Sequence, residues 1–184
     1  AGVNPANGDA LYYKNTIDDS GNLDRSTTTD INKAQRIFAG NPNPKYTFGI
    51  NNNFSYKNFD LGIFFQGVKG NKIFNAGGQY MSANASNGYD NQTADQMAYW
   101  DKPGDITVVP EPRLFAGNGV GNSTRYISDG SYLRLKTLTL GYTFPASVLT
   151  KIKLSKLRLY ATAQNLATIT GYKGWDPEVN ADYQ

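Results

Sequence analysis

Residues that could do chemistry are few in this chain. Its 184 residues include neither histidine nor cysteine, so it lacks the imidazole base of a catalytic triad and the usual ligands of zinc. An enzyme built from this sequence would have to work with carboxylates, lysine or tyrosine. No two carboxylates stand at a spacing that indicates glycoside hydrolysis. We therefore predict no catalytic residues and no cofactor.

One polar segment resembles a calcium-binding loop in its composition. In residues 15–24, NTIDDSGNLD, Asp18 and Ser20 fall on ligand positions three and five when Gly21 takes position six. Positions one and twelve are then threonines, so the bidentate carboxylate of such a loop is missing. We expect a solvated turn and no metal site, with calcium as the alternative.

Aromatic side chains in the polar connections could bind a ligand or a partner, because Tyr and Trp offer a large rigid contact area with a polar handle. The alternative is that these rings pack their own loops. The net charge of +3 is spread along the chain, without a basic stripe that would indicate nucleic acid. The candidates for substrate or partner contact are Tyr80, Tyr89, Tyr99, Trp100 and Trp175.

The elements that must position these residues are β-strands. Residues 46–56, YTFGINNNFSY, alternate between apolar and polar side chains, with Asn52 as the only break, and residues 59–65 resume the pattern. Lys57-Asn58 has the length of a two-residue hairpin loop, and Asn tolerates positive φ. Such a hairpin places Tyr56 opposite Phe59, and one of its faces is apolar from end to end.

Two further strands follow a long connection, which is rich in Gly, Asn and Ser. The segment 131–144 changes parity, because Leu133 and Leu135 are out of phase with Leu138 and Leu140, so we expect a bulge near Lys136-Thr137. Pro145 ends this strand. The segment 157–165 alternates again, with arginine and glutamine on one face, which therefore is not a dry core.

The solvent on the apolar face distinguishes two hypotheses. In a soluble β-sandwich, here a carbohydrate-binding module, a second sheet would cover this face. In a membrane barrel it would meet lipid. Eleven residues from Tyr46 to Tyr56, at about 3.3 Å each and tilted near 45°, span roughly 25 Å, the height of the apolar band of an outer-membrane barrel. Rings near both short turns and the alternation of short with long connections also favour the barrel.

The barrel interpretation assigns side chains to each solvent. Lumen-facing or plug-facing side chains are Arg134, Lys136, Arg158, Tyr160 and Gln164. Lipid-facing side chains are Phe48, Ile50, Phe54, Tyr56, Phe59, Leu61, Ile63, Phe65, Leu138, Leu140, Tyr142 and Phe144.

Three runs resemble the C-terminal barrel section of the SusC/RagA family of TonB-linked outer-membrane transporters of Bacteroidetes. They lie within residues 41–75, 125–145 and 157–180, and include NPNPKYTFG, DGSYLRLKTLTLGYTFP and LYATAQNL followed by DPE. The resemblance implies an all-β fold, part of a 22-stranded plugged barrel with long extracellular loops and short periplasmic turns. Residues 1–184 would be the C-terminal part of that barrel, and the plug domain and final strand are not present.

The resemblance also implies a function and partners. It predicts import of a glycan or peptide across the cell outer membrane, with a SusD-like lipoprotein over the extracellular side, TonB acting through the absent plug, and membrane lipid around the wall. No contact with nucleic acid is expected. The alternatives are the soluble carbohydrate-binding sandwich and an enzyme that uses carboxylates. The identity of the substrate and of the lipoprotein does not follow from these residues.

Overall fold

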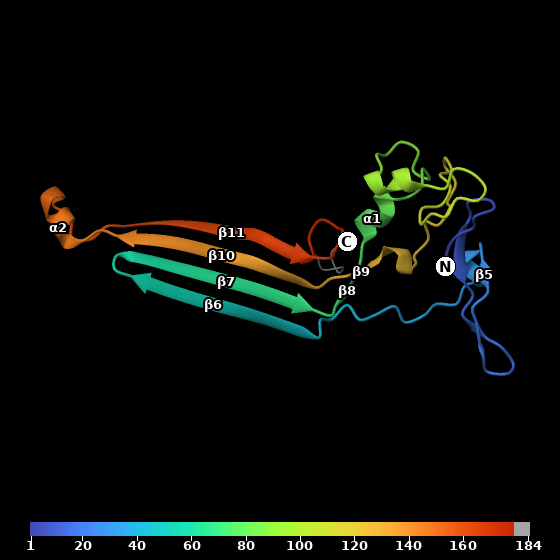
Figure 1. Ribbon diagram of the computed structural model, residues 1–184, viewed down its shortest axis with the longest axis horizontal. Helices are drawn as coiled ribbons and strands as arrows, with labels where there is room; N and C mark the ends of the chain where they lie inside the picture. Colours follow the sequence, from blue (N-terminus) through green and yellow to red (C-terminus); the bar gives the residue numbers. More distant parts are fainter. Residues whose placement is uncertain (179–184) are drawn as a thin grey trace. The chain divides into compact units, whose positions relative to one another are not determined.

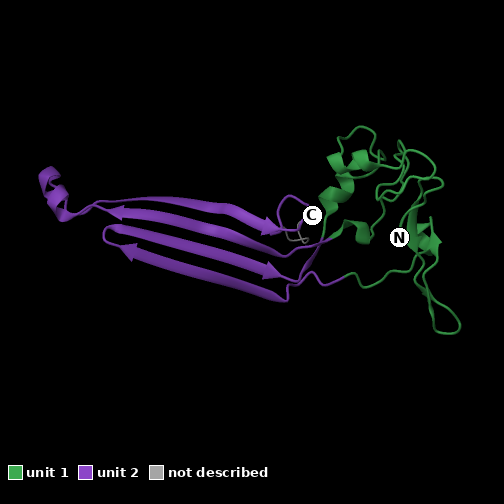
Figure 2. Cartoon of the chain, in the orientation of Figure 1, with its two compact units in different colours: residues 1–39, 74–127, 184 green, residues 40–73, 128–183 purple. Residues whose placement is uncertain are grey.

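The structure is a computed structural model that describes residues 1–178, and these divide into two compact units (Figure 2). Unit 1 comprises residues 1–39 and 74–127, and unit 2 comprises residues 40–73 and 128–178. None of the helices among the described residues is both long enough and apolar enough to span a membrane.

Unit 2 is built on one four-stranded antiparallel sheet with the strand order β11-β10-β7-β6 (Figure 1). Its strands are long, at 11 to 13 residues each. The strand predicted from Tyr46 to Tyr56 has these bounds in the structure. The four strands are β6 (Tyr46–Tyr56), β7 (Phe59–Lys69), β10 (Tyr132–Thr143) and β11 (Arg158–Thr170).

The first hairpin has the predicted register. Tyr56 pairs with Phe59, Phe54 with Leu61 and Ile50 with Phe65. The predicted turn Lys57-Asn58 joins the strands, but Lys57 rather than Asn58 has the positive φ, at 53°. The Lys57 ammonium lies 5.2 Å from the centroid of the Tyr56 ring, so a cation–π contact accompanies the strained residue.

The predicted bulge is also present. The pairing of β10 shifts between Leu135 and Thr137 on both sides. Opposite β7 the extra residue is Lys136, whereas opposite β11 the extra residue belongs to β11 and lies between Gln164 and Ala167. Because one extra residue reverses the alternation, Leu133 and Leu135 return to the face that carries Leu138 and Leu140.

Neither face of this sheet is covered by a second sheet among the described residues. Phe48 and Phe54 are 46% and 57% exposed, and Leu61 and Phe65 are partly exposed. A sandwich would bury all four of these side chains. The described residues therefore do not form the β-sandwich of the alternative hypothesis, and the apolar face of the sheet is left uncovered by them.

The connection between β10 and β11 folds into two short helical turns, α2 (Ala146–Leu149) and η4 (Thr150–Ile152). Leu149 is buried inside this connection, and the Leu154 N–H donates to the Leu149 carbonyl. Lys153 ends η4 with a left-handed φ of 56°. The connection is thus a defined local structure.

Unit 1 consists of short elements and connections. Strands β1 (Gly2–Val3), β2 (Ala10–Tyr13) and β5 (Thr27–Thr28) form a sheet in the order β1-β2-β5. Two further strands, β3 (Thr16–Ile17) and β4 (Leu23–Asp24), form a hairpin. The helical elements are η1 (Ile31–Lys33), α1 (Ala76–Met81), η2 (Ala94–Ala98) and η3 (Thr124–Tyr126). A separate two-stranded pair is formed by β8 (Lys72–Phe74) and β9 (Ile127–Asp129).

The polar segment with calcium-loop composition is the turn of the β3–β4 hairpin. The Asp18 carboxylate accepts hydrogen bonds from the backbone N–H groups of Ser20 and Asn22 at 2.9 and 2.8 Å. These bonds lower the pKa of Asp18, with the backbone bond from Asn22 as the main cause. Asp18 therefore closes a turn, and among residues 1–178 no group of three or more acidic side chains is arranged to hold a metal.

Candidate functional site

The apolar face of the unit 2 sheet contains all the side chains predicted to meet lipid. Strand pairing aligns them in rows, such as Tyr56–Phe59–Tyr142 and Phe54–Leu61–Leu140. One row contains a glycine, Gly67, and the Phe48 ring occupies its place, because a Cβ on Gly67 would lie 2.1 Å from that ring. The face is therefore apolar without a gap at this position.

Aromatic rings concentrate at the turn end of this face. The rings of Phe59 and Tyr142 lie 4.7 Å apart, and Phe144 packs edge-on against Tyr142 at 5.0 Å. Tyr56 completes this group beside the β6–β7 turn. The rings therefore gather at the short-turn end, where the sequence analysis predicted an interfacial girdle.

The opposite face of the sheet is polar. Near the turn end, Asp60 of β7 forms a bidentate ion pair with Arg158 of β11, and Gly141 of β10 lies between them. A Cβ on Gly141 would clash with both groups, at 2.5 Å from the Asp60 carboxylate and 2.6 Å from the Arg158 guanidinium. Glycine is thus the residue that lets this ion pair cross an intervening strand.

Further polar side chains line the same face. Thr139 and Thr162 share a hydrogen bond of 3.0 Å, and the Arg158 guanidinium lies 5.2 Å from the centroid of the Tyr160 ring. Tyr160, Thr162 and Gln164 pair with positions of β10 that face the same side. The residues predicted to face water from β11 therefore share this face.

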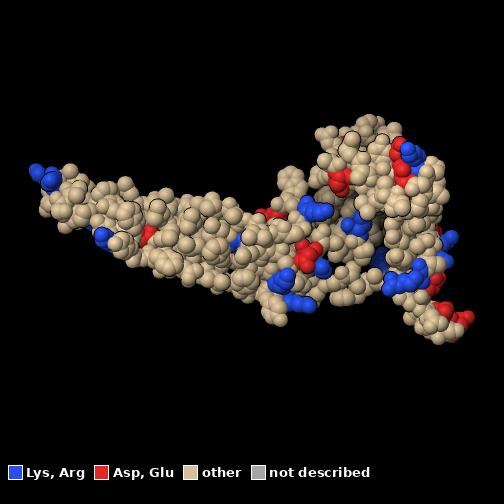
Figure 3. All heavy atoms as spheres, in the orientation of Figure 1, with Lys and Arg blue, Asp and Glu red and all other residues tan. Residues whose placement is uncertain are grey.

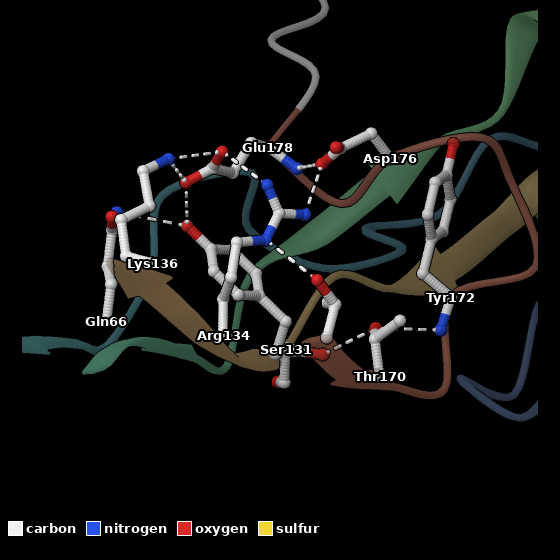
Figure 4. A network of polar contacts seen from close by, with 10 residues as sticks. Gln66, Ser131, Arg134, Lys136, Thr170, Tyr172, Asp176 and Glu178 are labelled. Atoms are coloured by element: carbon white, nitrogen blue, oxygen red, sulfur yellow. Dashed lines mark hydrogen bonds and ion pairs between the residues drawn. The ribbon is translucent and has the colours of Figure 1, made fainter. Parts of the chain in front are cut away.

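The other end of the polar face contains a charged network centred on Arg134, whose side chain is 4% exposed (Figure 4). Its guanidinium donates to Asp176 at 2.8 Å, to Glu178 at 2.6 Å and to Thr168 at 2.8 Å. Lys136 donates to both Glu178 oxygens at 2.9 Å. Two cations thus balance two carboxylates.

The charged network holds residues 171–178 against the polar face of β7 and β10, at the end of the strands opposite the short turns. The Tyr132 hydroxyl donates to Glu178 at 3.0 Å and accepts from Gln66 of β7 at 3.2 Å. The Arg134 hydrogen bond lowers the pKa of Asp176. Burial by itself would raise the pKa of Glu178, but hydrogen bonds from Lys136 and Tyr132 outweigh it and lower that pKa. Both carboxylates are therefore held ionised.

This network was only partly predictable. Arg134 and Lys136 lie on the polar side as expected, but Arg134 is covered by the chain's own carboxylates rather than offered to a lumen or plug. The sequence analysis missed Tyr132 and the pairing with Asp176 and Glu178. The available signal was a Trp-Asp-Pro-Glu run soon after a strand that pairs with a basic one.

The aromatic residues predicted to contact a ligand differ in exposure. In unit 1, Tyr80 and Tyr89 are 57% and 93% exposed, whereas Trp100 is 6% exposed and donates its indole N–H to the Pro5 carbonyl at 3.1 Å. Trp100 is therefore an anchor inside unit 1, which corrects its assignment as a contact residue. Tyr99 is half-exposed in unit 1, and Trp175 is exposed in unit 2.

A further exposed ring in unit 1, Phe115, was not among the predicted contact residues. The exposed Phe115 ring packs on Tyr89 with centroids 5.4 Å apart, so the two rings form one aromatic surface. Tyr80 hydrogen-bonds to Asp90 in the same loop region, which raises the pKa of its hydroxyl. Phe115 lies in the same polar connection as the predicted rings, but its sequence neighbours gave no periodic signal.

Comparison with known proteins supplies relatives of this chain, although no protein-family model matches it. TonB-dependent receptor P3 of Formosa agariphila is 42% identical over 151 residues, which cover 82% of this chain and 14% of that protein. TonB-dependent receptor SusC of Bacteroides thetaiotaomicron is 26% identical over 182 residues, which cover 92% of this chain and 17% of that protein. The RagAB peptide importer in its closed-closed state aligns with a TM-score of 0.79 and 27% identity over 97% of this chain.

Long antiparallel strands with one apolar and one polar face define a section of a transmembrane β-barrel. The chain belongs to the SusC/RagA family of TonB-dependent receptors, which are outer-membrane proteins. It spans about a sixth of the length of these relatives, between 14% and 19%.

Proposed function

We propose that residues 1–184 are the C-terminal part of the barrel of a SusC-like transporter, and that the full-length protein imports a glycan or a peptide with energy from TonB. The observation that carries this proposal is the unit 2 sheet, which pairs an apolar face with a polar, ion-paired one. The relatives named TonB-dependent receptor support the transport class, and the likeness to the RagAB peptide importer supports a peptide as one of the two candidate substrates.

The partners follow from the family. A SusD-like lipoprotein would cover the extracellular side, and TonB would act through a plug domain in another part of the polypeptide. The exposed rings of Tyr80, Tyr89, Tyr99 and Trp175 would contact the lipoprotein or the substrate. The polar face, with Arg158, Tyr160 and Gln164, would line the lumen or contact the plug. We propose no catalytic role for any residue.

The two faces can be tested with neighbouring residues in the middle of β6. Ile50 lies on the apolar face and Asn51 on the polar face. In the full-length protein, Ile50→Arg should lower the free energy of unfolding in phospholipid vesicles by about 2–4 kcal/mol, the cost of arginine at the bilayer midplane. The matched variant Asn51→Arg should change it by less than about 1 kcal/mol, because this side chain meets water. Equal effects in urea titrations would contradict the assignment of the faces.

Transport can be tested in the host cell. Deletion of the gene should abolish uptake of one class of fluorescently labelled oligosaccharides or peptides from a panel, and loss of TonB should have the same effect. The wild-type gene should restore uptake. Chemical turnover of the imported compound by the purified full-length protein would contradict a purely transporting role.

A further inference from the structure

The connection between β10 and β11, residues 145–157, has a surface to which the proposed function assigns no role. Its sequence, PASVLTKIKLSKL, contains three lysines and no acidic residue. Lys151, Lys153 and Lys156 are all exposed. None of them forms an ion pair with another residue in the range 1–178.

The same connection also exposes apolar side chains. Val148, Ile152 and Leu154 are 45%, 56% and 46% exposed, although Leu149 beside them is buried. The fold of α2 and η4 directs Leu149 inward, and the hydrogen bond from Leu154 to Leu149 closes the turn. The exposed apolar residues are therefore presented by a formed structure, interspersed with lysines.

The position of this connection indicates what covers it. It begins at Pro145, directly after Phe144, and Phe144 belongs to the aromatic group at the turn end of the sheet. In a barrel such rings lie at the level of the lipid headgroups. The connection thus starts at headgroup depth, where lysine can reach phosphate while apolar side chains enter the acyl boundary.

Positive charge at the turn end of the sheet is not confined to residues 145–157. Lys57 lies in the other turn at the same end, and the nearby Asp60 is neutralised by Arg158. At the loop end, Arg134 and Lys136 are paired with carboxylates, whereas Lys45, Lys69 and Lys173 are exposed. Figure 3 shows Lys and Arg atoms at the end of the sheet that carries α2. The turn end therefore has a net positive charge.

We propose that residues 145–157 bind the headgroups of anionic phospholipids in the periplasmic leaflet of the outer membrane. The three lysines supply attraction to phosphate, and Val148, Ile152 and Leu154 insert beside the girdle. This inference rests on the proposed function, because it requires the barrel to be embedded with its short turns in that leaflet.

The test uses the full-length protein in nanodiscs that contain a photoactivatable phosphatidylglycerol or, separately, a photoactivatable phosphatidylcholine. Mass spectrometry maps crosslinks to residues 145–157. We expect labelling by the anionic lipid to exceed labelling by the zwitterionic one. Replacement of the lysines (Lys151→Gln, Lys153→Gln and Lys156→Gln) should reduce this ratio at least tenfold, since each lysine near an anionic surface contributes about fivefold.

A matched control removes three exposed lysines from the other end of unit 2: Lys45→Gln, Lys69→Gln and Lys173→Gln. Labelling of residues 145–157 should stay unchanged in this variant. In the wild type, the ratio should fall toward one in 1 M salt, where the Debye length is about 3 Å.

Two outcomes would overturn the inference. The first is a ratio near one in the wild type at low salt. The second is an unchanged ratio in the variant without Lys151, Lys153 and Lys156. If either result came together with capture of an acidic periplasmic protein by residues 145–157, the lysines would be assigned to that protein. Failure of the wild type to insert as a barrel would instead refute the proposed function.

Discussion

Replacement of Arg134 by methionine should release residues 171–178 from the polar face. The variant Arg134→Met keeps an unbranched stem but removes the guanidinium and its hydrogen bonds to Asp176, Glu178 and Thr168. Breaking a buried ion pair costs about 3–5 kcal/mol, whereas exposed pairs contribute about 0.2–1 kcal/mol. The Asp176 and Glu178 side chains are 46% and 27% exposed, so water will compensate part of the loss. We therefore expect a value between these limits, about 2 kcal/mol.

Amide hydrogen exchange measures this local opening. The N–H of Glu178 donates to Asp176 at 2.8 Å, and the N–H of Tyr172 donates to Thr170 at 3.1 Å. A change of about 2 kcal/mol corresponds to roughly 30-fold faster exchange at these amides. Arg134→Lys should give an intermediate rate, because lysine keeps the charge but lacks the planar fork that meets two carboxylates.

Arg158→Met is the matched control, since it removes the ion pair with Asp60 at the turn end of the strands. Exchange at Glu178 should match the wild type in this variant. If Arg134→Met also left the rates at Tyr172 and Glu178 unchanged, burial of Tyr172 rather than the charged network would hold the segment, and the reasoning would be refuted.

Two further changes test other contacts. Gly141→Ala should separate Asp60 from Arg158 and lower the unfolding free energy of the full-length protein in urea by about 1 kcal/mol, the value of a partly exposed ion pair. The control Gly62→Ala should have less effect, because the added Cβ would meet nothing closer than 3.2 Å. Hydrogen bonds from Ser131, and secondarily Lys72, lower the pKa of Asp129 to about 2 from 3.8. The stabilisation that these hydrogen bonds give to the folded state is complete above pH 3.8 and is lost as the pH falls toward 2. Pepsin cleavage near residues 127–132 should therefore increase over this pH range in the wild type. Asp129→Asn should remove this dependence on pH.

The sheet could be predicted because local patterns determine it. Alternation from Tyr46 to Tyr56 and the two-residue turn fix both the faces and the register of the first hairpin, and the change of parity before Leu138 requires a bulge. These features depend on residues close in sequence, so one chain without relatives is sufficient to find them. Only the residue with positive φ in the turn was placed one position too far along the chain.

The contacts between distant segments could not be predicted in the same way. Pairing of Arg134 with Asp176 requires the chain to reverse after β11, and no periodic pattern indicates where an irregular segment returns. Burial of Trp100 depends on Pro5, which lies far away in sequence and belongs to unit 1. Composition marks such an indole as a possible contact residue, but only the fold shows whether it is accessible.

The extra residue in β10 divides this strand into two halves whose orientations are set independently. Substitution of Lys136 would alter one ion pair, but deletion of Lys136 would rotate the half-strand beyond it by one position. Leu133 and Leu135 would then move to the polar face of the sheet, and the Arg134 guanidinium to the apolar face. Position 136 should consequently accept many amino acids in an evolving population. Deletion of its single codon should instead prevent this part of the sheet from folding.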